Sequence, residues 1–208
     1  MATQDTALRE LVTAIVEGND SIVSQLLAAS PGLARARFQA GATRQTENYF
    51  LTQIGRYLWA GDTALHIAAA AYRTELVRML IASGADVHAK NRLGDNALHS
   101  ASVGQPGSIA WNPDAQSATI VCLVEAGADP NSMNKSGVSP LHRAVRTRCA
   151  AAVRTLLECG ANPELRNKNG STPMLLATNN TGRGGSGSPE AKSQQQEIQR
   201  LLEQRTGG

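Results

Sequence analysis

The sequence predicts an all-α solenoid in which short pairs of helices stack side by side, each pair joined to the next by a hairpin loop. The first observation behind this prediction is a repeated hexapeptide. GDTALH at Gly61–His66 returns as GDNALH from Gly94, as GVSPLH from Gly137 and, less closely, as GSTPML from Gly170. Two of the three intervals between these glycines are equal and the middle one is longer. Self-similarity at a fixed period of roughly 20–50 residues is the signature of a repeat architecture.

A second motif and the composition support the same fold. Gly-Ala-Asp begins at Gly84 and at Gly127, and Gly-Ala-Asn begins at Gly160, with the same long and short intervals that separate Gly94, Gly137 and Gly170. A single repeating unit, with an insertion in one copy, accounts for both series. Aromatic residues make up only 3% of the 208 residues, so the core is expected to consist of Leu, Ala, Val and Ile in small, closely packed helices.

Within each unit, the residue types fit two helices in order. Thr63, Asn96 and Ser139 stand where a first helix begins, and such side chains accept hydrogen bonds from the free N–H groups of a helix start. A second helix follows, as in Glu75–Ala82, and Gly84 stands where that helix ends in the left-handed region. The Asn, Lys and Gly residues after it predict a hairpin that leads to the next unit.

The repeat resembles the ankyrin repeat, which has a period of about 33 residues and the pattern T-P-L-H-x-A. Gly61 to Gly94 and Gly137 to Gly170 both match that period, and an alanine follows each of the three motif histidines by two positions, as the pattern requires. The resemblance implies recognition of other proteins through a concave face built from hairpin tips and first helices. It also implies that His66, His99 and His142 hydrogen-bond to the backbone between adjacent repeats and have a structural role.

We expect a single ankyrin-repeat domain over residues 1–208, with three loop insertions. Its parts are an N-terminal capping repeat at 7–37, an aromatic insertion at 38–60, central repeats at 61–93, 94–136 and 137–169, and a C-terminal capping repeat at 170–208. Capping repeats need a polar outer face, and the glutamine-rich final helix has that character.

The first two insertions carry most of the aromatic residues. Residues 38–60 hold five of the seven, among them Tyr57 and Trp59. This segment is either a flap that folds back over the first repeats or a contact surface, since aromatic residues are favoured at interfaces. The second insertion, Gly104–Pro113, is rich in Pro and Gly and predicts a loop between two helices. Its Trp111 either packs back onto its own repeat or projects outward.

The third insertion, at about residues 181–189, falls at the same turn of the last repeat. The repeat between the second and third insertions has a short turn, Arg146-Thr147-Arg148. This spacing suggests a basic notch with two loop walls. The glycine-rich third loop is either a flexible connector or a nest of backbone N–H groups that binds an anion together with Arg183.

Charge and composition exclude several classes. The net charge of +3 is too small to imply nucleic acid, although residues 139–170 carry six basic and two acidic residues. There is no long apolar run for a membrane helix and no pair of cysteines in a CxxC pattern, and we expect no secretory signal. We therefore expect a cytoplasmic protein that is monomeric by itself, with no metal, no cofactor, and no membrane or nucleic-acid partner.

No catalytic set of residues stands out, so the sequence predicts a non-enzymatic scaffold or adaptor whose partner is another protein, which can carry an acidic segment. The alternative is an anion or small-ligand receptor at the notch between the 104–113 and 181–189 loops. The three cysteines are expected to be small core residues, and the alternative for Cys149, beside Arg148, is a lowered pKa. The candidate partner-binding residues are Arg146, Thr147, Arg148, Trp111, Arg183, Tyr57, Trp59, Arg92, Lys135 and Lys168.

Overall fold

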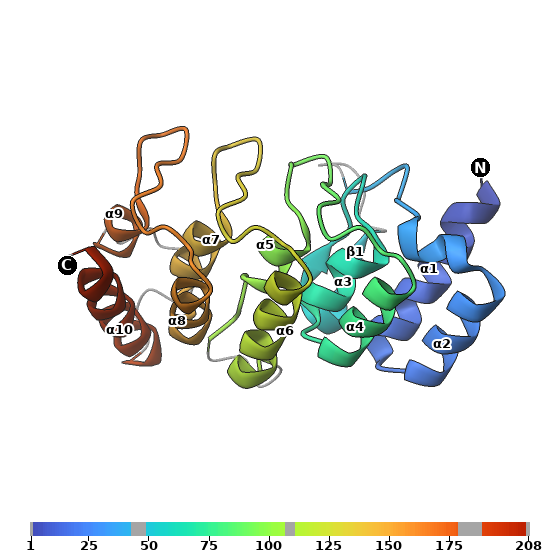
Figure 1. Ribbon diagram of the computed structural model, residues 1–208. Coiled ribbons are helices and arrows are strands. Elements are labelled where there is room, and N and C mark those ends of the chain that lie inside the picture. Colours follow the sequence, from blue (N-terminus) through green and yellow to red (C-terminus); the bar gives the residue numbers. More distant parts are fainter. Residues whose placement is uncertain (1, 43–48, 107–110, 179–188, 207–208) are drawn as a thin grey trace.

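A computed structural model describes residues 2–42, 49–106, 111–178 and 189–206 of the chain. Over these residues the chain forms five pairs of α-helices stacked from the N-terminal to the C-terminal end (Figure 1). The pairs are α1 (Ala2–Glu17) with α2 (Asp20–Ala29), α3 (Ala64–Ala70) with α4 (Thr74–Ala82), α5 (Ala97–Ala101) with α6 (Pro113–Glu125), α7 (Pro140–Arg146) with α8 (Ala150–Glu158), and α9 (Pro173–Thr178) with α10 (Pro189–Thr206). The other described elements are the 3-10 helices η1 (Pro31–Arg35) and η2 (Thr52–Ile54) and an antiparallel hairpin of β1 (Phe50–Leu51) and β2 (Arg56–Tyr57).

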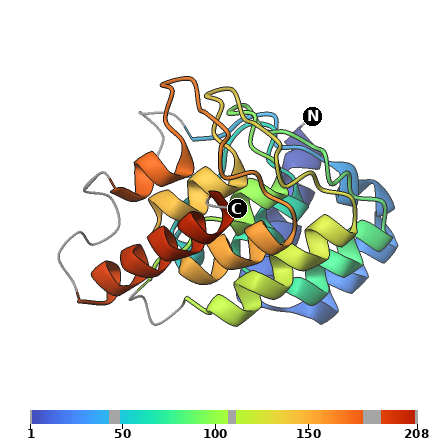
Figure 2. The same ribbon diagram turned by 60° about the vertical axis from the view of Figure 1, so that its left-hand side comes forward.

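The helices form two layers. The first helices α1, α3, α5, α7 and α9 contact one another in sequence, and the second helices α2, α4, α6, α8 and α10 form a parallel row behind them. The loops that follow α4, α6 and α8 rise on the same side of the stack (Figures 1 and 2). We call them the finger loops, residues 83–95, 126–138 and 159–171. The predicted all-α solenoid is therefore confirmed, with one short hairpin added to it.

The helix boundaries follow from the capping residues. The backbone N–H of His99 donates to Asn96 Oδ1 at 3.1 Å, and that of Leu175 donates to Thr172 Oγ1 at 3.2 Å. Gly84, just beyond the end of α4, has a φ of 90°. This left-handed conformation carries a steric cost for any residue with a Cβ, so glycine is the residue that ends the helix here.

Small apolar residues let the two layers approach closely. Ala68, Ala101 and Ala144, the alanines of the repeat motif, have no exposed surface. The core runs without interruption from Leu8 in α1 to Leu202 in α10. Each repeat therefore buries its apolar face against its neighbours, as expected for a solenoid.

The aromatic insertion folds back onto the first repeats. The Phe38 backbone N–H donates to Asp62 O at 2.9 Å, and the Phe38 carbonyl accepts from Gly61 N–H at 2.7 Å. The Phe38 ring and Leu58 are each only 2% exposed. Of the two interpretations, the flap describes this inner part of the segment. Its outer part, described below, remains accessible.

Candidate functional site

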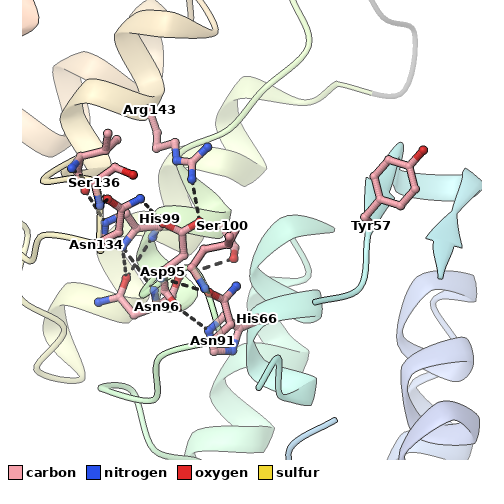
Figure 3. A network of polar contacts seen from close by, with 12 residues as sticks. Tyr57, His66, Asn91, Asp95, Asn96, His99, Ser100, Asn134, Ser136 and Arg143 are labelled. Carbon is pink, nitrogen blue, oxygen red and sulfur yellow. Dashed lines mark hydrogen bonds and ion pairs between the residues drawn. The ribbon is translucent and has the colours of Figure 1, made fainter. Parts of the chain in front are cut away.

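A ladder of buried polar groups holds the finger loops in place. The amide Nδ2 of Asn91 donates to Asp62 Oδ1 at 2.9 Å, and one repeat later Nδ2 of Asn134 donates to Asp95 Oδ1 at 2.8 Å. Oδ1 of Asn91 in turn accepts from the backbone N–H groups of Leu93 and Asp95. Figure 3 shows part of this network around Asp95. The loops are therefore pre-organised, which lowers the ordering cost of binding at their tips.

The three motif histidines tie neighbouring repeats together. Nε2 of His66 is 3.0 Å from Asp95 O, Nε2 of His99 is 2.9 Å from Val138 O, and Nε2 of His142 is 3.0 Å from Ser171 O. Nε2 must carry the proton to donate to a carbonyl, and Nδ1 of each ring accepts from the backbone N–H of the residue that caps its helix, so each ring is in a neutral form. Burial lowers the pKa of all three, that of His99 to about 4. These contacts match the structural role that the resemblance implied.

Three cations mark equivalent points on consecutive loops. Arg92, Lys135 and Lys168 each lie two positions before a repeat glycine, and all three side chains are exposed. Their backbone N–H groups make equivalent hydrogen bonds to the preceding loop, to the carbonyls of Ala60, Leu93 and Ser136 respectively. In the described part of the chain, none of the three forms an ion pair with a carboxylate. We call these three residues the basic row.

An aromatic cluster continues the basic row toward the N-terminus. Trp59 lies two positions before Gly61, the place that Arg92 has in the next repeat. The Arg92 guanidinium is 4.8 Å from the centre of the Trp59 ring, and the Tyr57 ring lies 6.0 Å from that of Trp59. Phe50 packs on Tyr57 across the hairpin at 4.8 Å. We call Phe50, Tyr57 and Trp59 the aromatic cluster. Phe50 and Tyr57 are 42% and 45% exposed.

A tether through Arg56 fixes the hairpin over the first helices. Its Nη2 donates to both carboxylate oxygens of Asp62, at 3.1 and 3.2 Å, and its Nη1 donates to the His66 carbonyl at 3.1 Å. The Asp62 side chain is fully buried and also accepts from the backbone N–H of Trp59 at 2.8 Å. An ion pair between a half-buried arginine and a buried carboxylate, with several hydrogen bonds to each group, holds the hairpin in one position.

A hollow of about 370 Å³ lies between the hairpin and the first helices. Its walls are residues 52–56 of the insertion, the C-terminal end of α3, the side of α5, and the Gln105 and Trp111 side chains of the second insertion. The two insertions come close, since a Cβ on Gly55 would lie 2.7 Å from Gln105 Nε2. No local pattern in the sequence indicates this hollow, because two separate insertions build it.

Trp111 of the second insertion, for which two interpretations were open, packs back onto its own repeat. Trp111 Nε1 donates to Gln116 Oε1 at 2.9 Å, and Gln116 Nε2 donates to the carbonyl of Ala101 at 2.8 Å. Gln116 is fully buried, and Trp111 is half-buried. Trp111 therefore forms a wall of the hollow and does not project freely outward.

The basic notch differs from the expectation. Arg148 has a φ of 57° and is only 5% exposed, so its side chain does not form an exposed floor. Arg146 is half-buried, and Thr147 Oγ1 donates to the Arg143 carbonyl at 3.0 Å. Residues of α9 and α10 pack over this turn and leave a space of about 10 Å³, enough for about one water molecule. Arg183 and most of the third insertion lie outside the described residues.

The cysteine singled out by the sequence and the possible metal ligands can be placed in the described part of the chain. Cys149 has no exposed surface, as expected of a core residue, and burial raises its pKa to about 11, so the alternative of a lowered pKa beside Arg148 is wrong. Within the described ranges, no three His, Cys, Asp or Glu side chains are placed to hold a metal ion. None of the helices in those ranges is both long enough and apolar enough to cross a bilayer.

The repeat pattern has known counterparts. A family model described as ankyrin repeats in three copies matches residues 11–111 and 108–186. The chain belongs to the ankyrin-repeat family. Among curated proteins, ankyrin repeat and SOCS box protein 16 of Mus musculus is 35% identical over 87 residues, which are 42% of this chain and 19% of that protein. This ankyrin-repeat chain thus aligns with about a fifth of that relative. Ankyrin repeats in general bind other proteins, which gives this chain its broad functional class.

Proposed function

We propose that this ankyrin-repeat chain is a non-enzymatic scaffold or adaptor that binds an acidic segment of a partner protein along its finger loops. The observation that carries the proposal is the basic row. Arg92, Lys135 and Lys168 recur at one position of consecutive repeats, are exposed and have no carboxylate partner in the described chain. Exposed cations on a rigid surface attract and orient an acidic chain.

The spacing of the basic row suggests how the acidic residues of such a segment are spaced. Stacked helices are about 8–10 Å apart, and equivalent residues of neighbouring repeats follow that step. A segment in the polyproline II conformation advances by about 3.1 Å per residue with three residues per turn, so every third side chain lies on the same face. A carboxylate at every third residue of such a segment therefore meets one cation per repeat. An acidic segment with its charges in one block meets fewer of them.

The aromatic cluster supplies the second half of the interface. Exposed aromatic side chains are over-represented among the residues that dominate binding energy. Phe50 and Tyr57 are accessible next to Trp59, and Trp59 stacks under Arg92 at the start of the basic row. Tyr57, Trp59 and the basic row thus form one continuous candidate surface. The same proposal includes that the protein is a monomer and acts in the cytoplasm.

The alternative receptor for an anion at the notch has less support. Arg148 is buried, and the space beside Arg146 holds about one water molecule. A carboxylate or phosphate group needs more room than that. Arg146 and Thr147, at the C-terminal end of α7, stay candidates, and Trp111 is a candidate through the hollow that it lines.

A pair of matched charge-reversal variants tests the proposal. In the first, Lys135→Glu and Lys168→Glu invert two members of the basic row. In the control, Lys192→Glu and Arg205→Glu invert two exposed cations of α10, so the net charge is the same. The probes are two labelled peptides of equal composition, one with Glu at every third residue and one with the Glu residues adjacent. Binding is measured by fluorescence anisotropy at about 50 mM and about 500 mM salt.

We expect the spaced peptide to bind more tightly than the blocked one at low salt, and the row variant to lose about tenfold in affinity while the control variant does not. High salt should reduce the difference between row variant and wild type. Equal losses in both variants would mean that only net charge matters, and binding of the row variant at wild-type strength would remove the finger loops from the interface.

A further inference from the structure

The hollow beneath the hairpin has the size and the walls of a binding site for one bulky group. Its volume of about 370 Å³ lies at the lower end of the range of small-ligand pockets, about 300–1,000 Å³. That is too little for a helix or strand of a partner and enough for a single large side chain. Both of the protein's two tryptophans, Trp59 and Trp111, line it together with Tyr72.

The aromatic walls favour an aromatic occupant. Aromatic rings attract one another beyond the burial of area when they meet edge to face or offset. Ile54, Leu93 and Val103 complete the apolar lining between the rings. An aromatic side chain placed there exchanges water for aromatic and aliphatic contacts on several sides, whereas a small side chain leaves most of the hollow unfilled.

The accessible charge in the hollow is positive. Arg143 keeps 28% of its side-chain surface exposed and uses Nη2 to donate to Asp95 Oδ2 at 2.7 Å. Asp95 is 8% exposed, and its other carboxylate oxygen accepts from Asn134, so little of its negative charge faces the hollow. Arg56 also lines the wall, but its guanidinium is bonded to Asp62 and His66. Arg143 is therefore the group best placed to meet a carboxylate, as its position at the edge of the network in Figure 3 illustrates.

The hollow is continuous with the proposed partner surface. Trp59 lines the hollow and also lies against the guanidinium of Arg92, the first member of the basic row. Leu93, the next residue along, forms part of the lining. A segment that lies along the finger loops therefore passes over the mouth of the hollow at its N-terminal-repeat end.

We propose that the hollow is an anchor site for one aromatic side chain of the acidic partner segment, with a neighbouring carboxylate of that segment on Arg143. This inference rests on the proposed function. It specifies the partner sequence that the site recognises, which is an aromatic residue with acidic residues before or after it. The occupant belongs to a polypeptide, because the cations that hold the rest of the segment continue beyond the hollow along Lys135 and Lys168.

The test uses two peptides and the protein's own fluorescence. Both are acetylated and amidated, carry Glu at every third residue and lack tryptophan, and they differ only in having Phe or Ala at one position between two glutamates. Because the only two tryptophans of the chain line the hollow, filling it changes the intrinsic emission directly. Phenylacetate, a free aromatic carboxylate, serves as a third probe for a small-molecule ligand.

We expect the Phe peptide to bind at least about tenfold more tightly than the Ala peptide, since burying one large apolar side chain has at least that effect on an equilibrium constant. Only the Phe peptide should shift the tryptophan emission. Ala70→Phe, at the end of α3 in the lining, should fill the hollow from inside and remove the preference for Phe. Ala118→Phe, on the exposed side of α6, is the matched control.

The outcomes separate this inference from the proposed function. Equal affinity of the two peptides for the wild-type protein would overturn the anchor site, while dependence of both on the basic row would leave the proposed function standing. Saturation of the emission change by phenylacetate at the concentrations that the peptide needs would assign the hollow to a small ligand and contradict the proposal. If Ala70→Phe lowers the melting temperature, Val103→Phe, which fills the hollow from the exposed side of the loop after α5, replaces it.

Discussion

Acidification should destabilise the array through its buried histidines, and His99 allows the size of the effect to be worked out. Its ring is 1% exposed, accepts a hydrogen bond from the Asn96 backbone N–H at Nδ1 and lies 2.9 Å from Val138 O at Nε2. Protonation would place a charge in this dry site, and this cost of burial outweighs the hydrogen bond that a protonated Nδ1 could donate to Asn96 Oδ1, 2.6 Å away. Burial accordingly lowers the pKa of His99 from 6.5 to about 4.

The sign follows from comparing the two states. Because the pKa is lower in the folded chain than in the unfolded one, the unfolded state binds the proton more readily, so stability is full above pH 6.5 and falls as the pH drops toward 4. Between pH 7.5 and pH 5, these two pKa values correspond to a loss of about 2 kcal/mol from His99 alone. His66 and His142 add losses of the same sign, since burial lowers their pKa as well.

The assay is urea unfolding followed by far-UV circular dichroism at several pH values between 7.5 and 5. The window ends at pH 5, above the range in which most carboxylates titrate. The comparison variant is His99→Gln, whose amide can still donate to the Val138 carbonyl but does not titrate. Its unfolding free energy should fall by about 2 kcal/mol less than that of the wild type across the window. Parallel pH curves for the two proteins would refute the argument that a neutral, buried His99 carries this pH dependence.

Three further changes test other contacts. Arg56→Ala removes the tether to Asp62, so we expect a loss of about 2–3 kcal/mol in unfolding free energy and faster proteolysis within residues 38–60. Gly104→Ala drives a Cβ into the Cys149 thiol and should lower stability by about 1–3 kcal/mol, whereas Gly32→Ala, with open space around it, should not. Cys149 should resist alkylation at pH 8 until the protein unfolds, which mass spectrometry of the labelled peptides would report, because it is fully buried with a pKa of about 11.

The repeated elements could be predicted because their signals are local and periodic. Asn96 caps α5 through the backbone N–H of His99, only one helical turn away, and Gly84 ends α4 by its own backbone freedom. Neither depends on the distant chain. The histidine contacts join one repeat to the next. The resemblance to the ankyrin repeat predicted them, because the same contact recurs between neighbouring repeats.

The parts that the sequence could not predict depend on contacts between insertions or between an insertion and the stack. The hollow exists because the Arg56 guanidinium pairs with the Asp62 carboxylate and because Gly55, in the first insertion, lies close to the Gln105 side chain in the second. From the sequence, Arg148 is expected to be a surface cation in a basic stretch. Its burial is explained only by the left-handed turn and by the packing of α9 and α10. No spacing in the chain encodes either outcome.

One periodic signal does connect sequence and site, and it bears on how a partner segment would be oriented. The position two before each repeat glycine holds Trp59, Arg92, Lys135 and Lys168 in turn, so this position changes from aromatic to basic along the array. Cations alone, repeated at one step per repeat, would let an acidic segment slide by a repeat at little cost. A single aromatic anchor at one end makes such a slip lose its best contact. On our proposal, the aromatic insertion therefore sets the register and the direction of the bound segment, and the basic row supplies attraction along its length.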